Sequence, residues 1–214
     1  MALTLSSALS ALRNELRDPS GLAWPDDVLT EALRDALAHY SGVSPRVVNQ
    51  VYTLTGLAGK DEVTLPAAWN IRVILAFWAP WDTGRASAGQ MAPRPFRETA
   101  PPNGIVLVDG HCFADPEVVR VLYTTDHTLT GLDGAGATTV PAAHERGLLL
   151  VAQGQAAAVR QRQVAEAENV SSAGRLRVET WARERQREAR DWLTSITRSD
   201  SAFVTWGYPW QQSA

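Results

Sequence analysis

The chain has 214 residues, of which 45% are hydrophobic and 20% are charged, and its formal net charge is −3. This composition is that of a globular protein with enough apolar side chains for a packed core. A single cysteine, Cys112, excludes an internal disulfide framework and a zinc site built from four cysteines.

The first forty-odd residues predict a helical hairpin. Residues 3–17 place leucines on one helical face, at Leu5, Leu9, Leu12 and Leu16. This segment lacks a basic start, so we expect an amphipathic helix and not a signal peptide. The sequence DPSG predicts a turn, after which Pro25 suits the first position of a second helix. We expect Gly42 to end that helix.

The middle of the chain changes to the period of β-strands. Alternating or strongly apolar segments occur at 47–56, 61–66, 70–78, 103–110 and 116–125. A loop rich in Pro, Gly and Ala runs from 79 to about 95, and a glycine-rich loop follows the last strand. We predict a small all-β unit over residues 46–140.

Helical patterns return after Pro141, over residues 142–168 and 175–197. The last helix carries a stripe at three-to-four spacing, formed by Val178, Trp181, Arg185, Ala189, Trp192 and Ile196. Neither hairpin can bury its apolar stripe alone. The sequence therefore predicts an α+β fold in which residues 1–45 and 141–198 form a four-helix core of two hairpins, with the β unit inserted between them.

Residues 199–214 are predicted to form an extended tail after the last helix. Its apolar side chains are candidates for binding a partner, namely Phe203, Val204, Trp206, Tyr208 and Trp210. Two interpretations stay open, because the tail can fold back on its own core or be kept for another protein.

Charge gathers modestly in the second hairpin, where residues 155–198 hold nine arginines and six acidic residues. A solvated helix face with ion pairs four residues apart explains this pattern. A contact between subunits explains it as well, with Arg183, Arg187 and Arg190 as candidates. Direct duplex binding would require a clustered basic face and a higher isoelectric point.

No pattern in the chain predicts a catalytic site. In VDGHCFAD, His111 and Cys112 are neighbours that point to opposite faces of a strand, so His111 is badly placed to activate the thiol. Asp109 and His111 could share a face, but two metal ligands without a third form a weak site. Gly59 and Lys60 lack the remaining residues of a phosphate loop. We expect no enzyme activity and no cofactor or metal, and the longest apolar runs are too short to cross a membrane.

The residues of the first hairpin resemble a known family. The segment 11–46 is similar to the opening of head–tail connector (adaptor) proteins of tailed double-stranded DNA bacteriophages. The matching positions are Asp18, Pro19, Ser20, Gly21, Trp24, Asp26, Leu29, Ala32, Leu33, Tyr40 and Ser41. Segments 63–69, 121–145 and 181–190 also resemble such adaptors. The β insertion and the aromatic end depart from a minimal adaptor.

The resemblance implies a structural protein of the virion that assembles at the head–tail junction in the host cytoplasm. Such proteins form a ring, usually dodecameric, beneath the portal. The ring extends the DNA channel and provides a platform for the tail or stopper protein. The expected partners are the portal, neighbouring copies of the chain, and genomic DNA that passes through the lumen without sequence-specific binding.

Two other functions fit the sequence less well. The β unit could be a monomeric module that binds a carbohydrate or a peptide, with Trp78 and Trp81 as a stacking surface. An enzyme would have to use the region from Asp109 to Cys112.

Overall fold

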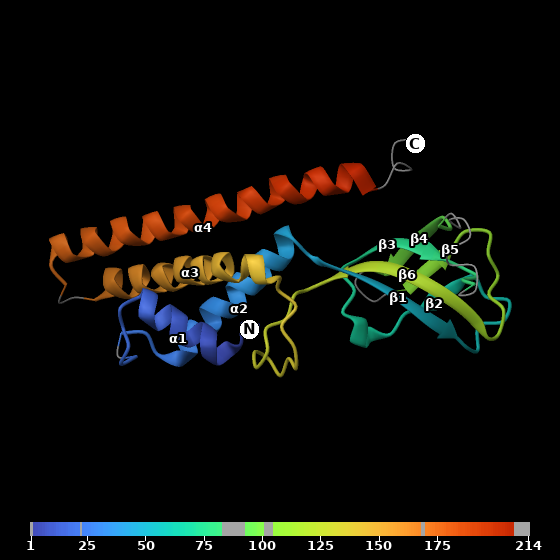
Figure 1. Cartoon of the computed structure of the whole chain (residues 1–214), viewed down its shortest axis with the longest axis horizontal. Coiled ribbons are helices and arrows are strands. Elements are labelled where there is room, and N and C mark those ends of the chain that lie inside the picture. The colour runs from blue at the N-terminus through green and yellow to red at the C-terminus, as the bar shows by residue number, and fades with distance from the viewer. Residues whose placement is uncertain (1, 22, 83–92, 101–104, 168–169, 208–214) are drawn as a thin grey trace. The chain divides into compact units, whose positions relative to one another are not determined.

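The chain forms two compact units, Met1–Ser44 with His127–Ala214, and Pro45–Asp126. The computed structural model describes residues 2–21, 23–82, 93–100, 105–167 and 170–207, with the backbone alone for 99–100 and 198–207 (Figure 1). Residues 127–140, which the sequence assigned to the β unit, belong to the helical unit. Helices and two small antiparallel sheets occur together, so the predicted α+β class is confirmed.

The helical unit contains α1 (Leu5–Glu15), α2 (Asp26–Val43), the 3-10 helix η3 (Ala142–His144), α3 (Glu145–Glu166) and α4 (Ser172–Gly207). One hydrophobic cluster takes buried side chains from all four α-helices and from residues 129–140. Figure 1 shows α3 and α4 running side by side over much of their length.

Local capping explains why the first hairpin forms where the sequence predicts it. The Thr4 side chain accepts from the Ser7 N–H, and the Ser7 hydroxyl accepts from the Thr4 N–H, which gives α1 a capping box. In the turn that follows, the Asp18 carboxylate accepts hydrogen bonds from the N–H groups of Ala23 and Trp24, at 3.0 and 2.8 Å. These bonds satisfy backbone donors just before α2 begins at Asp26.

The close approach of α3 to α4 depends on glycine. A Cβ atom at Gly147 would lie 1.8 Å from the Trp192 ring, and one at Gly154 would lie 3.1 Å from the Ala189 side chain. Larger residues on α3 would therefore push α4 away. Trp192 in turn stacks on Tyr40 of α2, with ring centroids 5.9 Å apart.

The sequence-based prediction for the end of α4 was wrong. An extended tail was expected from residue 199, but the helical backbone continues to Gly207. Residues 199–206 contain neither Gly nor Pro, and the first residues that disfavour a helix are Gly207 and Pro209. The helix therefore has no local reason to stop earlier.

The β unit contains β1 (Arg46–Leu54), β2 (Glu62–Thr64), the 3-10 helix η1 (Ala67–Trp69), β3 (Val73–Trp78), β4 (Phe96–Ala100), β5 (Ile105–Val108) and β6 (Glu117–Thr125). The strands form two three-stranded sheets, in the orders β1-β6-β3 and β2-β5-β4. All pairings are antiparallel. A second hydrophobic cluster lies within this unit, and Phe77 and Phe113 are among its buried side chains.

Candidate functional site between α1 and α4

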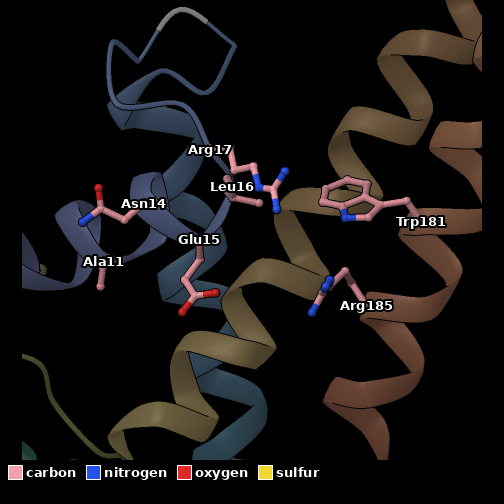
Figure 2. Close-up of a pocket in the computed structure, with 7 residues that line it drawn as sticks. All are labelled: Ala11, Asn14, Glu15, Leu16, Arg17, Trp181 and Arg185. Atoms are coloured by element: carbon pink, nitrogen blue, oxygen red, sulfur yellow. The ribbon is translucent and has the colours of Figure 1, made fainter.

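A groove opens in the helical unit between the end of α1 and α4. Its volume is about 890 Å³, and it is lined by Ala11, Asn14, Glu15, Leu16, Arg17, Trp181 and Arg185. Figure 2 shows Arg17 reaching toward the Trp181 indole, while Glu15 and Arg185 point into the space between the two helices.

Arg17 is held in place by an uncommon backbone conformation. Its φ is +56°, in the left-handed region that residues other than Gly rarely adopt. Its N–H donates to the Asn14 carbonyl oxygen at 3.2 Å, which closes the end of α1. This conformation turns the chain into the Asp18 loop, and it leaves the Arg17 side chain on the groove wall.

Trp181 forms the opposite wall and is anchored from behind. Its ring centroid lies 6.2 Å from that of Trp24, whose N–H is held by the Asp18 carboxylate. The turn that positions Arg17 therefore also positions the residue on which Trp181 packs. The indole is packed against the hydrophobic cluster on one side and lines the groove on the other.

Charged groups of both signs line the groove without neutralising one another. Arg185 pairs within α4 with Glu188, at 2.8 Å. Among the described residues, no ion pair joins Glu15 to Arg17 or to Arg185. The groove thus offers a carboxylate, guanidinium groups and an indole, which suits an extended protein segment with polar and apolar side chains.

The comparisons with known proteins leave the family open. A scan against protein-family models gives no match, and a search of curated proteins gives no significant match.

Sequence reasoning did not assign this groove, although one signal was present. The apolar stripe of α4 includes Arg185 at a position where its neighbours along the stripe are apolar. A charged residue within such a stripe indicates a place where the helix faces a polar opening or a partner. Arg17 carries no comparable signal, because its position depends on a turn conformation that the sequence does not specify.

The three arginines predicted as subunit contacts lie along α4. Arg183 pairs with Glu179 at 2.5 Å, and Arg187 lies 3.7 Å from Asp191 with 80% of its side chain exposed. Arg190 lines a smaller groove between α2, α3 and α4, beside His39 and Gln155. The structure does not bring the three together in one pocket, and whether they contact a neighbouring copy stays a prediction.

The predicted docking residues fall at the end of α4. Phe203, Val204 and Trp206 lie in its helical backbone, and their side chains lie outside the described part. Tyr208 and Trp210 lie outside the described residues altogether.

In the region around Cys112, the side chains that an enzyme would have to use contact other residues. His111 Nε2 lies 2.6 Å from Glu117 Oε1, and the other Glu117 oxygen accepts from the Ala114 N–H at 2.7 Å. The Cys112 residue is exposed. The imidazole is thus engaged by Glu117, and Asp109 lies 3.4 Å from Arg97.

The tryptophans proposed as a ligand-stacking surface are also engaged. The Arg120 guanidinium lies 5.1 Å from the Trp78 ring centroid and 4.6 Å from that of Trp81. This cation–π arrangement occupies ring faces that a sugar would need.

In the part of the chain that the structure describes, no group of three His, Cys, Asp or Glu side chains could hold a metal ion. No helix there is long and apolar enough to span a bilayer.

Proposed function

We propose that the chain is a structural head–tail adaptor of a tailed phage, which forms a dodecameric ring beneath the portal, extends the DNA channel and provides the platform for the tail or stopper protein. In this proposal the helical unit is a four-helix core of two hairpins that packs against neighbouring copies in the ring.

The proposal rests on where the structure places the residues that match the adaptor family. Asp18 holds the turn before α2 through two backbone hydrogen bonds, and Trp24 packs on Trp181 of α4. Tyr40 is fully buried and its hydroxyl lies 2.6 Å from His144 Nδ1. The matching positions thus join the first hairpin to the second, which supports a shared fold and not chance similarity in a loop.

The length of α4 supports a docking role for its end. Gly147 faces Trp192 and Gly154 faces Ala189, so α3 and α4 run antiparallel. Extending this alignment to Glu145, the first residue of α3, places it level with about residues 194 to 198 of α4. The backbone from 199 to 207 continues past that point by roughly 13 Å. In this proposal the part of α4 that continues past α3 docks on another protein through Phe203, Val204 and Trp206.

A ring would strengthen such a contact. Buried aromatic anchors commonly cost about 2 kcal/mol or more each when truncated. Repetition of the contact around the ring turns modest single affinities into stable attachment. Genomic DNA must slide through the lumen, so the lumen should be neutral or acidic, and the arginines of α4 should face protein neighbours.

The test uses portal rings and two matched variants. Replacing Phe203, Val204 and Trp206 together with serine should abolish co-sedimentation with portal rings. A control in the same segment, Ser199→Ala with Ser201→Ala, should bind as the native chain does. Equal binding by both variants would remove the docking role of this segment.

A second measurement separates ring assembly from portal docking. Charge reversal at Arg183, Arg187 and Arg190 should weaken the contact between copies while a single copy still docks. Electron microscopy of particles should place the chain between portal and tail, and a strongly basic lumen would contradict the proposal.

A further inference from the structure

Strand β1 is a long edge strand of its sheet. It runs over nine residues, Arg46–Leu54, and pairs with β6 on one side. The pairing is continuous from end to end, without a bulge. Among the described residues no strand pairs with its other edge. Val47 and Val51 are 56% and 47% exposed, and the strand contains no proline and no lysine.

The other three sheet edges of the β unit are protected. β2 has only three residues. β4 has an irregular register between Glu98 and Ala100. β3 has a bulge after Ile74, whose N–H donates to the Glu98 carboxylate at 2.8 Å, and its Phe77 carbonyl oxygen accepts from the Arg94 N–H at 2.7 Å. Proteins protect free edges in these ways because bare edges pair with other strands. β1 has none of these features.

The β1 sequence, RVVNQVYTL, is complementary to itself in an antiparallel pair. With Gln50 opposite Gln50 of a second copy, Val48 faces Tyr52 and Asn49 faces Val51. A β-branched residue opposite an aromatic one is a favourable cross-strand pair. The only charge in the strand, Arg46, falls opposite Leu54, so no like charges meet.

The charges at the two ends of β1 also match. A groove of about 610 Å³ lies at the end of β1 and beside β2, and its charged lining residues are Lys60, Asp61 and Glu62, with a net charge of −1. In the antiparallel pair, Arg46 of one copy arrives opposite Leu54 of the other, at the mouth of this groove. Its guanidinium can then approach two carboxylates, and the two-fold symmetry repeats the contact.

We infer that β1 is a self-association site, at which two copies of the chain pair antiparallel through their β1 edges, centred on Gln50. This contact is isologous, whereas successive copies in a cyclic ring meet through head-to-tail contacts. The β1 pair would therefore form between copies of the chain that are not assembled into a ring. The inference does not depend on the proposed function.

The first experiment is sedimentation velocity of the full chain over a range of concentrations, with two matched variants. Val51→Lys places lysines diagonally across the two-fold axis, at about 7–8 Å. It should weaken dimerisation by about tenfold or more. Val73→Lys makes the same change at a similarly exposed position, 52%, on the protected β3 edge. It should leave dimerisation unchanged.

The second experiment tests the register by disulfide formation. In a Cys112→Ser background, Gln50→Cys should form a disulfide-linked dimer on oxidation, because residue 50 faces itself. Val48→Cys should not, because residue 48 faces Tyr52 of the other copy. Circular dichroism checks that each variant is folded.

A native chain that stays monomeric at every concentration would overturn the inference, and so would a dimer that Val51→Lys and Val73→Lys weaken equally. Cross-linking through position 48 and not through position 50 would also overturn it. Failure to bind portal rings would leave these results unaffected, because none of these measurements involves the portal.

Discussion

At the residue scale, Gly147 decides how closely α3 packs on α4. A methyl group there would meet the Trp192 ring, which is fixed by stacking on Tyr40 and by an edge contact with His144. We expect Gly147→Ala to destabilise the fold, because overpacking costs about 1–3 kcal/mol while alanine gains only about 1 kcal/mol over glycine in a helix.

A matched control for this change is Gly42→Ala. Gly42 also lies in an α-helix, but a Cβ atom there would meet nothing within 4 Å. This variant should be unchanged or more stable, by up to about 1 kcal/mol. Urea unfolding measures both, and a Gly147→Ala chain as stable as Gly42→Ala would contradict the packing described for Trp192.

Tyr123 should make the stability of the β unit sensitive to alkaline pH. Its ring is 3% exposed and stacks on Trp69, and its hydroxyl donates to Gln50 Oε1 at 3.0 Å. Burial raises the pKa of the phenol above its usual value, and the nearby Arg46 guanidinium opposes part of this rise. Because the folded state favours the neutral phenol, its contribution is complete below the unfolded pKa of about 10 and is lost as pH rises through the folded pKa.

The measurement is the unfolding free energy as a function of pH, with Tyr123→Phe as the control. The native chain should lose more stability than the variant at alkaline pH. Tyrosinate absorbance of the native chain should contain a late-titrating component that is lost in Tyr123→Phe. Parallel stability curves for the two proteins would contradict this account.

At the element scale, removing the end of α4 tests whether that segment contributes to the stability of the chain itself. A chain ending at Arg198 removes helix that lies beyond α3. We expect lower helicity by circular dichroism but an unchanged unfolding midpoint, because the shortened chain keeps the hydrophobic cluster of the helical unit, including Ile196, which is 4% exposed. A clear drop in the midpoint would favour the alternative in which the segment packs on its own core.

The elements that sequence predicted well are those with strong local patterns. α1 and α2 have clear apolar stripes and cap or turn residues, and β6 has β-branched residues at five of its nine positions. β4 was missed because FRETA has little apolar character and becomes a strand only through its pairing with β5. The predicted strand 70–78 begins later, at Val73, because Asn70 is left-handed at the end of η1.

The candidate groove depended on features that no local pattern specifies. Its walls come from residues far apart in the chain, such as Arg17 and Trp181, and they meet only when the helical unit folds. Arg185 in the apolar stripe of α4 is the one local sign of the groove, and the residues of α1 that face it carry no such sign.

At the scale of the whole molecule, the β unit is inserted at a point where the helical unit nearly closes on itself. The His127 N–H donates to the Ser41 hydroxyl at 2.9 Å, so the two chain crossings leave the helical unit close together. They also enter the β unit side by side, since Arg46 pairs with Thr125. Each unit has its own hydrophobic cluster.

This arrangement predicts that the helical unit can fold without the insertion. Replacing residues 45–126 with a short Gly/Ser linker should leave a cooperative, helical unfolding transition, because closing a short loop between adjacent ends costs little entropy. Thermal unfolding followed by circular dichroism measures it, with the intact chain as reference. Loss of a cooperative transition in the shortened chain would show that the helical unit needs the β unit for its stability. It would contradict the proposal that residues 45–126 are an insertion into an adaptor core that folds independently.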